Sequence, residues 1–304
     1  MQQDEHRAAD GARIATYTWL PESGTPRALL QIAHGAAEHG RRYARFARFL
    51  AGHGYAVIAS DHRGHGATAP ATGGRGVVGE DAWRAMVTDL KGIGDHAAAA
   101  HPGVPLVLLG HSMGSLLARD YAQEYGADLA GLILSGTFRT LPGLDIDGAV
   151  AELDQEIAAH GRTHLSPFIP RNFSSFNDAF TPRTGYEWLS RDVAEVDLYV
   201  ADDDCGFAFC AGLAVDWVRA IRKMNDPAHL ARIPRGLPVH VAVGELDPCH
   251  QGLTLVHELL EDFRYLGTRD LTWKAYEGAR HEILNETNRD EVQGDLLAWL
   301  DKHV

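Results

Sequence analysis

Short apolar runs alternate with longer stretches of helical periodicity along most of the chain. The apolar runs are typical of strands buried in a sheet, and they occupy residues 13–19, 28–33, 55–60, 106–109, 129–135, 238–244 and 271–276. Apolar residues at helical spacing predict helices over residues 43–52, 80–101, 113–125, 253–266 and 290–302. This alternation predicts an α/β fold with a mostly parallel central sheet and helices on both of its faces.

The alternation stops between residues 136 and 235, a segment that we call the insert. A structureless loop of that length is uncommon inside a compact domain, so the insert needs elements of its own. Helical spacing of its apolar residues predicts one helix over residues 146–157 and another over 210–224. We therefore predict a core made of residues 1–135 and 236–304, with residues 136–235 inserted as a mainly helical subdomain.

The strongest local motif is Gly110-His111-Ser112-Met113-Gly114, which follows a predicted strand and opens a predicted helix. This is the context of a nucleophile elbow, a sharp turn that lifts a serine hydroxyl above the sheet. Glycines on both sides let the backbone pack where a Cβ atom would collide. A chance Gly-Ser turn is the alternative, but the flanking strand and helix favour Ser112 as a nucleophile.

A serine hydroxyl becomes an effective nucleophile only when a neighbouring base accepts its proton. The chain has 17 histidines, so position rather than residue type must select that base. His281 lies in the loop after the last predicted strand, and an imidazole is mostly neutral at pH 7. We expect His281 to be the general base, the alternative being a hydrogen-bonded loop histidine.

An acidic residue should orient the imidazole of His281. Asp247 follows the next-to-last predicted strand, which places it at the carboxyl edge of the sheet together with the elbow. The chain order Ser112, Asp247, His281 is the order found in α/β-hydrolases. Glu245 is the rival acid and Glu282 a weaker one, but the position after the strand favours Asp247.

The negative oxygen of a tetrahedral intermediate needs N–H donors that are already in place. One donor is expected from Met113, directly after the nucleophile. The other is expected from Ala36, in the loop of residues 34–40 after a predicted strand, unless that loop is merely a turn containing glycine. Both groups belong to the backbone, so side-chain replacement would not reveal them.

These motifs together resemble the serine α/β-hydrolases of the monoglyceride lipase and lysophospholipase group. The resemblance is carried by His34-Gly35, Glu38-His39, Arg42-Tyr43, Asp61-His62-Arg63-Gly64-His65-Gly66, the elbow, Gly244 through Asp247-Pro248, and His281-Glu282-Ile283-Leu284-Asn285-Glu286. It implies a cap over the active site, ester hydrolysis and no cofactor. It also implies catalytic roles for Ser112, Asp247 and His281, with oxyanion amides at Ala36 and Met113.

The insert departs from the family and is rich in aromatic residues. Asp203-Asp204-Cys205-Gly206-Phe207 is similar to an Asp-Pro-x-Cys-Gly-Phe pattern of bacterial relatives but lacks the proline. Seven of the ten phenylalanines lie in the insert: Phe138, Phe168, Phe173, Phe176, Phe180, Phe207 and Phe209. Some must form the core of the insert, and we expect the others to line a groove for an acyl chain.

Composition and charge limit the kinds of partner that this protein can bind. The net charge of −13 at pH 7 argues against a nucleic-acid partner and against tight docking on anionic lipids. No apolar run approaches the ~18 residues needed to span a bilayer, although transient membrane contact stays open. Three cysteines and an N-terminus without signal-peptide features indicate a cytoplasmic protein. The oligomeric state cannot be predicted.

Three other motifs have simpler interpretations than a cofactor or metal site. Residues 74–79 match G-x-G-x-x-G, but no strand precedes them, which argues against dinucleotide binding. His34, His39, His62 and His65 do not have the spacing of a zinc site, and residues 202–204 are a typical solvated acidic run. Cys249 is expected to be a small packing residue.

The sequence therefore predicts an enzyme that cleaves single-chain lipid esters through an acyl-enzyme, without cofactor or metal. An esterase or thioesterase for small soluble esters is the first alternative, because fold and catalytic residues do not separate these substrates. A non-catalytic binding protein on the same fold is the second.

Overall fold

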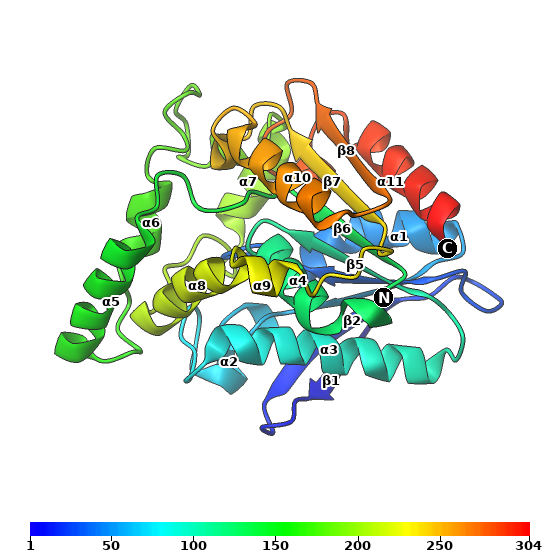
Figure 1. Ribbon diagram of the computed structural model, residues 1–304, viewed down its shortest axis with the longest axis horizontal. Coiled ribbons are helices and arrows are strands. Elements are labelled where there is room, and N and C mark those ends of the chain that lie inside the picture. The colour runs from blue at the N-terminus through cyan, green and yellow to red at the C-terminus, as the bar shows by residue number, and fades with distance from the viewer.

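The apolar runs, together with the polar strand β1, form one sheet of eight strands, which runs from β1 at the bottom of Figure 1 to β8 at the top. The computed structural model describes residues 1–304. Along the sheet the order is β1-β2-β4-β3-β5-β6-β7-β8, and the strands are β1 Gln2–Arg7, β2 Arg13–Trp19, β3 Leu29–Ala33, β4 Ala56–Ser60, β5 Leu106–His111, β6 Gly131–Ser135, β7 Val239–Gly244 and β8 Leu271–Tyr276. The pairs from β4 to β8 are parallel, whereas β2 runs antiparallel to β1 and β4. The predicted fold class is confirmed.

Strand β1 is the one strand that the apolar pattern does not predict. Its sequence, Gln-Gln-Asp-Glu-His-Arg, is polar throughout, and almost all of its residues are exposed. It pairs residue by residue with β2 at the edge of the sheet. Backbone hydrogen bonds, which leave no mark on the side-chain pattern, therefore hold this strand.

Helices cover both faces of the sheet, as predicted. Helices α1 (Ala44–Gly52) and α11 (Arg289–His303) share one apolar cluster with alternate residues of the central strands, such as Leu30 and Ile32. Helices α3 (Ala82–Ala100), α4 (Met113–Tyr125) and α10 (Thr254–Leu266) share the other cluster, with Leu29. Successive strand residues point to opposite faces, so the two clusters are separate. The short α2 is Ala69–Thr72.

The insert leaves the sheet after β6 and returns at β7, and its helices gather on the left of Figure 1. They are α5 (Ile146–His160), α6 (Phe168–Phe173), α7 (Val193–Ala201), α8 (Ala211–Met224) and α9 (Pro227–Leu230). Helices α5 and α8 correspond to the two predicted helices. Trp217 of α8 stacks on Trp83 of α3, with 6.2 Å between ring centroids. The apolar core of the insert is thus continuous with one face of the sheet.

No helix of this fold has both the length and the apolar composition that crossing a bilayer requires.

Candidate active site

Ser112 occupies a strained turn between β5 and α4. Its backbone angles, φ +53° and ψ −121°, are unfavourable for a residue with a side chain. A Cβ on Gly110 would lie 2.2 Å from the carbonyl oxygen of Gly114, and one on Gly114 would lie 2.1 Å from that of Ala33. Only glycine fits at both positions, so the motif forms the predicted sharp turn at the end of the strand.

Asp247 and His281 form a buried pair after β7 and β8. The Nδ1 atom of His281 lies 2.7 Å from Oδ2 of Asp247, and the other carboxylate oxygen accepts the N–H of Cys249 at 2.8 Å. Burial opposes the charged imidazole, but the carboxylate of Asp247 outweighs it and raises the pKa of His281. Burial likewise opposes the Asp247 carboxylate, but contact with His281 lowers its pKa. The pair is therefore built to stabilise an imidazolium ion.

The two rival acids lie elsewhere. Glu282 forms a two-pronged ion pair with Arg42, at 2.6 and 2.7 Å. Burial would raise the pKa of Glu282, but the guanidinium lowers it to about 2. Glu245 accepts the N–H of Gly278 at 2.9 Å and is exposed. Of the three candidate acids, only Asp247 bonds to His281.

Ser112, His281 and Ala36 line one cavity of about 290 Å³. The imidazole of His281 packs between two aromatic rings, with centroid distances of 4.8 Å to His111 and 5.0 Å to Trp188. Ser112 and His281 share the cavity without a hydrogen bond between them, and such bonds commonly tighten only when substrate binds. Ser112 and His281 therefore lie at one site, together with the Asp247 carboxylate that bonds to His281.

The two predicted oxyanion amides are free to donate a hydrogen bond to a substrate oxygen. Neither the N–H of Ala36 nor that of Met113 donates a hydrogen bond within the protein. Ala36 belongs to the cavity lining, and Met113 begins helix α4 directly after Ser112. The first N–H groups of a helix have no intrahelical partner, which suits them to a negative oxygen.

Aromatic and aliphatic side chains of the insert complete the cavity. Of the seven phenylalanines of the insert, Phe173, Phe207 and Phe209 line it, together with Ile169 and Trp188. Three others are buried in the apolar core: Phe138, Phe168 and Phe176. The insert therefore divides its aromatic residues between its own core and the cavity.

A buried polar network around Glu38 at the cavity was not predicted from the sequence. Glu38 accepts the N–H of Gly35 at 2.6 Å and the hydroxyl of Tyr43 at 2.8 Å, and it pairs with Arg42 at 2.7 Å. Since Arg42 also binds Glu282, this network joins the loop of Ala36 to the loop of His281. The spacing of Glu38 and Arg42, four residues apart, is the signal that could have revealed the pair.

The loop histidines form local contacts. His34 and His62 pack at 4.0 Å between centroids, and Nε2 of His65 accepts the N–H of Ala37 at 3.3 Å. Burial lowers the pKa of His62 to about 3 and that of His65 to about 4. These imidazoles are neutral at pH 7 and support the loop of Ala36.

Two groups of side chains have the residue types of a metal site, and one of them, Asp247, Cys249 and His281, includes the catalytic pair described above. In the other, the ligand atoms of His39, Asp202 and Cys205 lie within 4.8 Å of one another. However, His39 Nε2 and the Asp202 carboxylate already bond to each other at 2.9 Å. Burial raises the pKa of the Cys205 thiol well above its usual range, so the thiol is protonated, which opposes metal binding.

The glycine-rich segment 74–79 has a structural role. A Cβ on Gly76 would lie 1.9 Å from the carbonyl oxygen of Ala208, and the N–H of Cys210 donates to the Gly76 carbonyl at 2.8 Å. The glycine permits a close backbone approach between the core and the insert.

The fold and this arrangement define an α/β-hydrolase with a serine, a histidine and a carboxylate at the carboxyl edge of its sheet. Residues 24–288 match the family Hydrolase_4, described as serine aminopeptidase, S33. The chain belongs to this family.

Relatives match almost the whole chain, the insert included. The monoacylglycerol lipase of Mycolicibacterium smegmatis is 29% identical over 99% of this chain and 98% of its own length. The monoglyceride lipase of Homo sapiens is 32% identical over 97% of this chain and 89% of its own length. A thermostable carboxyl esterase from Bacillus coagulans, solved in complex with glycerol, gives a TM-score of 0.91 at 26% identity, covering 99% of this chain and 98% of its own.

Proposed function

We propose that this protein is a serine carboxylic ester hydrolase that cleaves single-chain lipid esters, with monoacylglycerols as its substrate class. The observation that carries the proposal is the single cavity that contains Ser112, the Asp247-bound His281 and the aromatic side chains of the insert. Relatives that are monoglyceride lipases share both the core and the insert, which supports the same chemistry and substrate class.

In the proposed reaction, the Ser112 hydroxyl attacks the ester carbonyl while Nε2 of His281 takes its proton. The amides of Ala36 and Met113 stabilise the oxyanion, and Asp247 stabilises the imidazolium. The ester C–O bond then breaks, and His281 returns the proton to the leaving alcohol. Water, deprotonated by His281, next hydrolyses the acyl-Ser112 ester and releases the fatty acid.

We propose that the insert acts as the cap of this site, with the acyl chain against its apolar lining. Phe173, Phe207 and Phe209 offer aromatic surface to an acyl chain. This apolar lining supports a lipid ester over a small soluble ester, which would leave the aromatic surface without a partner.

Peptide hydrolysis is the second candidate, because the family description names aminopeptidases. An aminopeptidase needs a free carboxylate to hold the ammonium group of its substrate. The two carboxylates in the cavity lining, Glu38 and Glu282, both bind Arg42, at 2.7 and 2.6 Å. Neither of them is therefore free to hold an ammonium group, which favours an ester substrate over a peptide with a free N-terminus.

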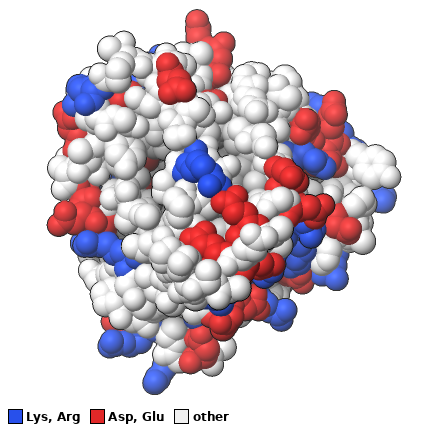
Figure 2. Space-filling view, turned by 90° about the vertical axis from the view of Figure 1, so that its left-hand side faces the viewer, with Lys and Arg blue, Asp and Glu red and all other residues white.

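We further propose that helix α7 touches lipid surfaces transiently while substrate is collected. Its side chains Val193, Leu198 and Val200 are 57%, 65% and 49% exposed. Acidic and basic side chains are interspersed on the face of the molecule shown in Figure 2, and the net charge is −13. Contact with a bilayer would therefore depend on apolar side chains and favour zwitterionic lipids.

A cytoplasmic location stays a prediction, supported by three free cysteines.

The test measures fatty-acid release from a monoacylglycerol and a lysophospholipid, and amine release from an aminoacyl amide, side by side with Ser112→Ala as the blank. We expect serine-dependent release that is fastest from the monoacylglycerol. Serine-dependent cleavage of the amide alone would replace ester hydrolysis by peptidase activity. Failure of a fluorophosphonate to label Ser112 in folded protein would indicate a binding protein instead.

A further inference from the structure

The insert contacts the loop of His281 through its backbone. Residues 187–191 run beside this loop, where the N–H of His281 donates to the Trp188 carbonyl at 3.3 Å and that of Glu282 donates to the Leu189 carbonyl at 2.8 Å. The peptide that carries the general base is thus held by the insert as well as by the core.

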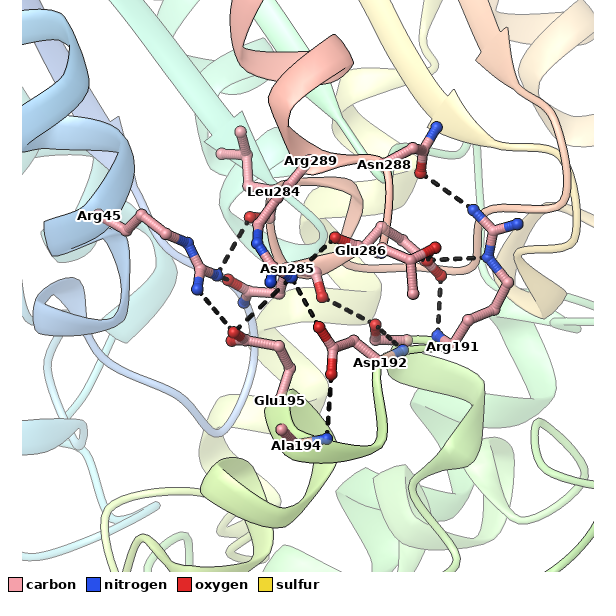
Figure 3. A network of polar contacts seen from close by, with 12 residues as sticks. Arg45, Arg191, Asp192, Ala194, Glu195, Leu284, Asn285, Glu286, Asn288 and Arg289 are labelled. Atoms are coloured by element: carbon pink, nitrogen blue, oxygen red, sulfur yellow. Dashed lines mark hydrogen bonds and ion pairs between the residues drawn. The ribbon is translucent and has the colours of Figure 1, made fainter.

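Glu286 lies at the centre of this contact (Figure 3). It is completely buried, and its Oε1 atom accepts the backbone N–H groups of Arg280 and Arg191, both at 2.9 Å. Its Oε2 atom accepts Nε of Arg191 at 2.8 Å and the N–H of Thr287 at 2.9 Å. One carboxylate therefore ties the residue before His281 to the residues that lead into helix α7.

The first turn of α7 continues the same network (Figure 3). Asp192 caps the helix by accepting the N–H of Ala194 at 3.0 Å, and it pairs with Arg289 at 2.8 Å. Glu195 pairs with Arg45 of α1 at 2.6 Å. Buried and half-buried pairs of this kind are directional and hold one geometry, so this end of α7 is fixed to the core.

The last turns of α7 hold the other half of the site. The hydroxyl of Tyr199 donates to the Ala37 carbonyl at 3.1 Å, and the N–H of Gly206 donates to the same oxygen at 2.9 Å. Ala37 has a φ of +51°, an unfavourable angle for alanine that surrounding contacts must maintain. Ala36, whose N–H is the proposed oxyanion donor, directly precedes it.

We propose that helix α7 is a strut that sets the distance between the general base and the oxyanion loop, with Glu286 and Tyr199 as positioning residues at its two ends. The proposal rests on the proposed function and deepens it. Glu286 lies outside the cavity lining and acts through His281, whereas Tyr199 lines the cavity and its hydroxyl acts through Ala37 on the neighbouring Ala36.

The first test replaces Glu286 by Gln, which puts an amide N–H₂ group against N–H donors, and by Asp, which keeps the charge but is too short. We expect kcat per fluorophosphonate-titrated site to fall about tenfold or more in both variants. The acidic limb of kcat/KM should also move to lower pH. The groups that face His281 are Asp247, Glu282, Glu38 and His111, and displacement from Asp247 removes the largest stabilisation of the imidazolium.

Asp216→Asn is the matched control, because this half-buried carboxylate also binds a backbone N–H, of Ala82 at 3.0 Å, and an arginine, Arg162 at 2.8 Å. It lies outside the cavity lining, so it should lose thermal stability while keeping its kcat and acidic limb. Arg191→Gln removes the side-chain donor of Arg191 to Glu286 and repeats the test in a chain that keeps the buried carboxylate. Glu286 variants with wild-type kcat per site and an unmoved acidic limb would overturn the proposal.

The second test is Tyr199→Phe, which deletes one hydroxyl. We expect kcat to fall several-fold, up to about tenfold, with the acidic limb unchanged, because the oxyanion loop loses a contact and the pair of Asp247 and His281 does not. Tyr55→Phe, which loses a part-buried bond of 2.6 Å to Asp301 outside the cavity lining, should keep the wild-type kcat. Equal kcat in both variants would refute the strut, whereas an inactive wild-type protein would refute the proposed function instead.

Discussion

The elbow and the insert meet at one cavity, but different physics determines each of them. Ser112 is placed by neighbours in sequence: a strand, two glycines and a helix, with no room for any other residue at the glycine positions. The insert is placed by contacts between residues about 100 positions apart, such as Asp192 with Arg289. The nucleophile is therefore positioned by its own sequence neighbourhood, whereas the cavity wall that we propose for the acyl chain is positioned by tertiary packing.

Variants of the core and variants of the insert should differ in how they change the rates for short and long esters. Changes at the core residues should slow the hydrolysis of every ester by the same factor, because they act at the reacting carbonyl. Changes at the apolar lining of the insert should alter the ratio between long and short acyl chains. Tyr199 belongs with the core residues here, because its hydroxyl holds the oxyanion loop. A core variant that altered the ratio, or an apolar-lining variant that slowed all esters equally, would contradict this division.

The largest effect is expected for Asp247→Asn. The amide can no longer stabilise the imidazolium, and it favours the wrong tautomer of His281, so kcat should fall on the order of 10⁴-fold for all chain lengths. Glu245→Gln, two residues earlier and exposed, should keep the wild-type rate. Measured rates that fall for Glu245→Gln and not for Asp247→Asn would reverse the assignment of the acid.

A smaller loss, about 100-fold or more, is expected for Ala36→Pro, because the substitution deletes a single oxyanion N–H. Ala36→Ser keeps that N–H and provides the control. Steady-state kinetics should show the loss in kcat for short and long esters alike. Near-normal turnover of a folded Ala36→Pro protein would remove Ala36 from the oxyanion hole.

The local encoding of the core explains why so much of it could be predicted. The central parallel strands β3 to β7 are buried on both faces and read as continuous apolar runs. The edge strands β2 and β8 also follow from the apolar pattern, whereas the polar β1 does not. The pairing of Asp247 with His281 follows from chain order. Glu286 could not be assigned a role, because three of its partners are backbone amides, at Arg280, Arg191 and Thr287, and a sequence carries no mark of such bonds. Helix α7 was not predicted for a related reason, because it is short and ion pairs with distant residues fix its position.

The pH dependence of activity should reflect the titration of His281, a core residue, and not the apolar lining of the insert. The pKa of His281 is raised by Asp247 in spite of burial, and the base works only when it is neutral. Activity should therefore fall on acidification, with the midpoint above the ordinary histidine pKa of about 6.5 and about a tenfold loss for each further pH unit. The profile of kcat/KM should be the same for short and long esters. Undiminished activity below about pH 5 would exclude His281 as the base.

The smallest effect, and the one that tests the insert, is expected for Phe207→Ala. Removing one aromatic ring from the cavity lining should slow the hydrolysis of long-chain monoacylglycerols a few-fold relative to short-chain ones, corresponding to about 1 kcal/mol of lost apolar contact. Phe49→Ala, on the opposite face of the sheet, should leave this ratio unchanged. If Phe207→Ala slowed all esters equally, the ring would act on the catalytic geometry, and the division between a core that sets rate and a lining that selects the acyl chain would fail. If it changed neither ratio nor rate, the acyl chain would lie along another part of the cavity.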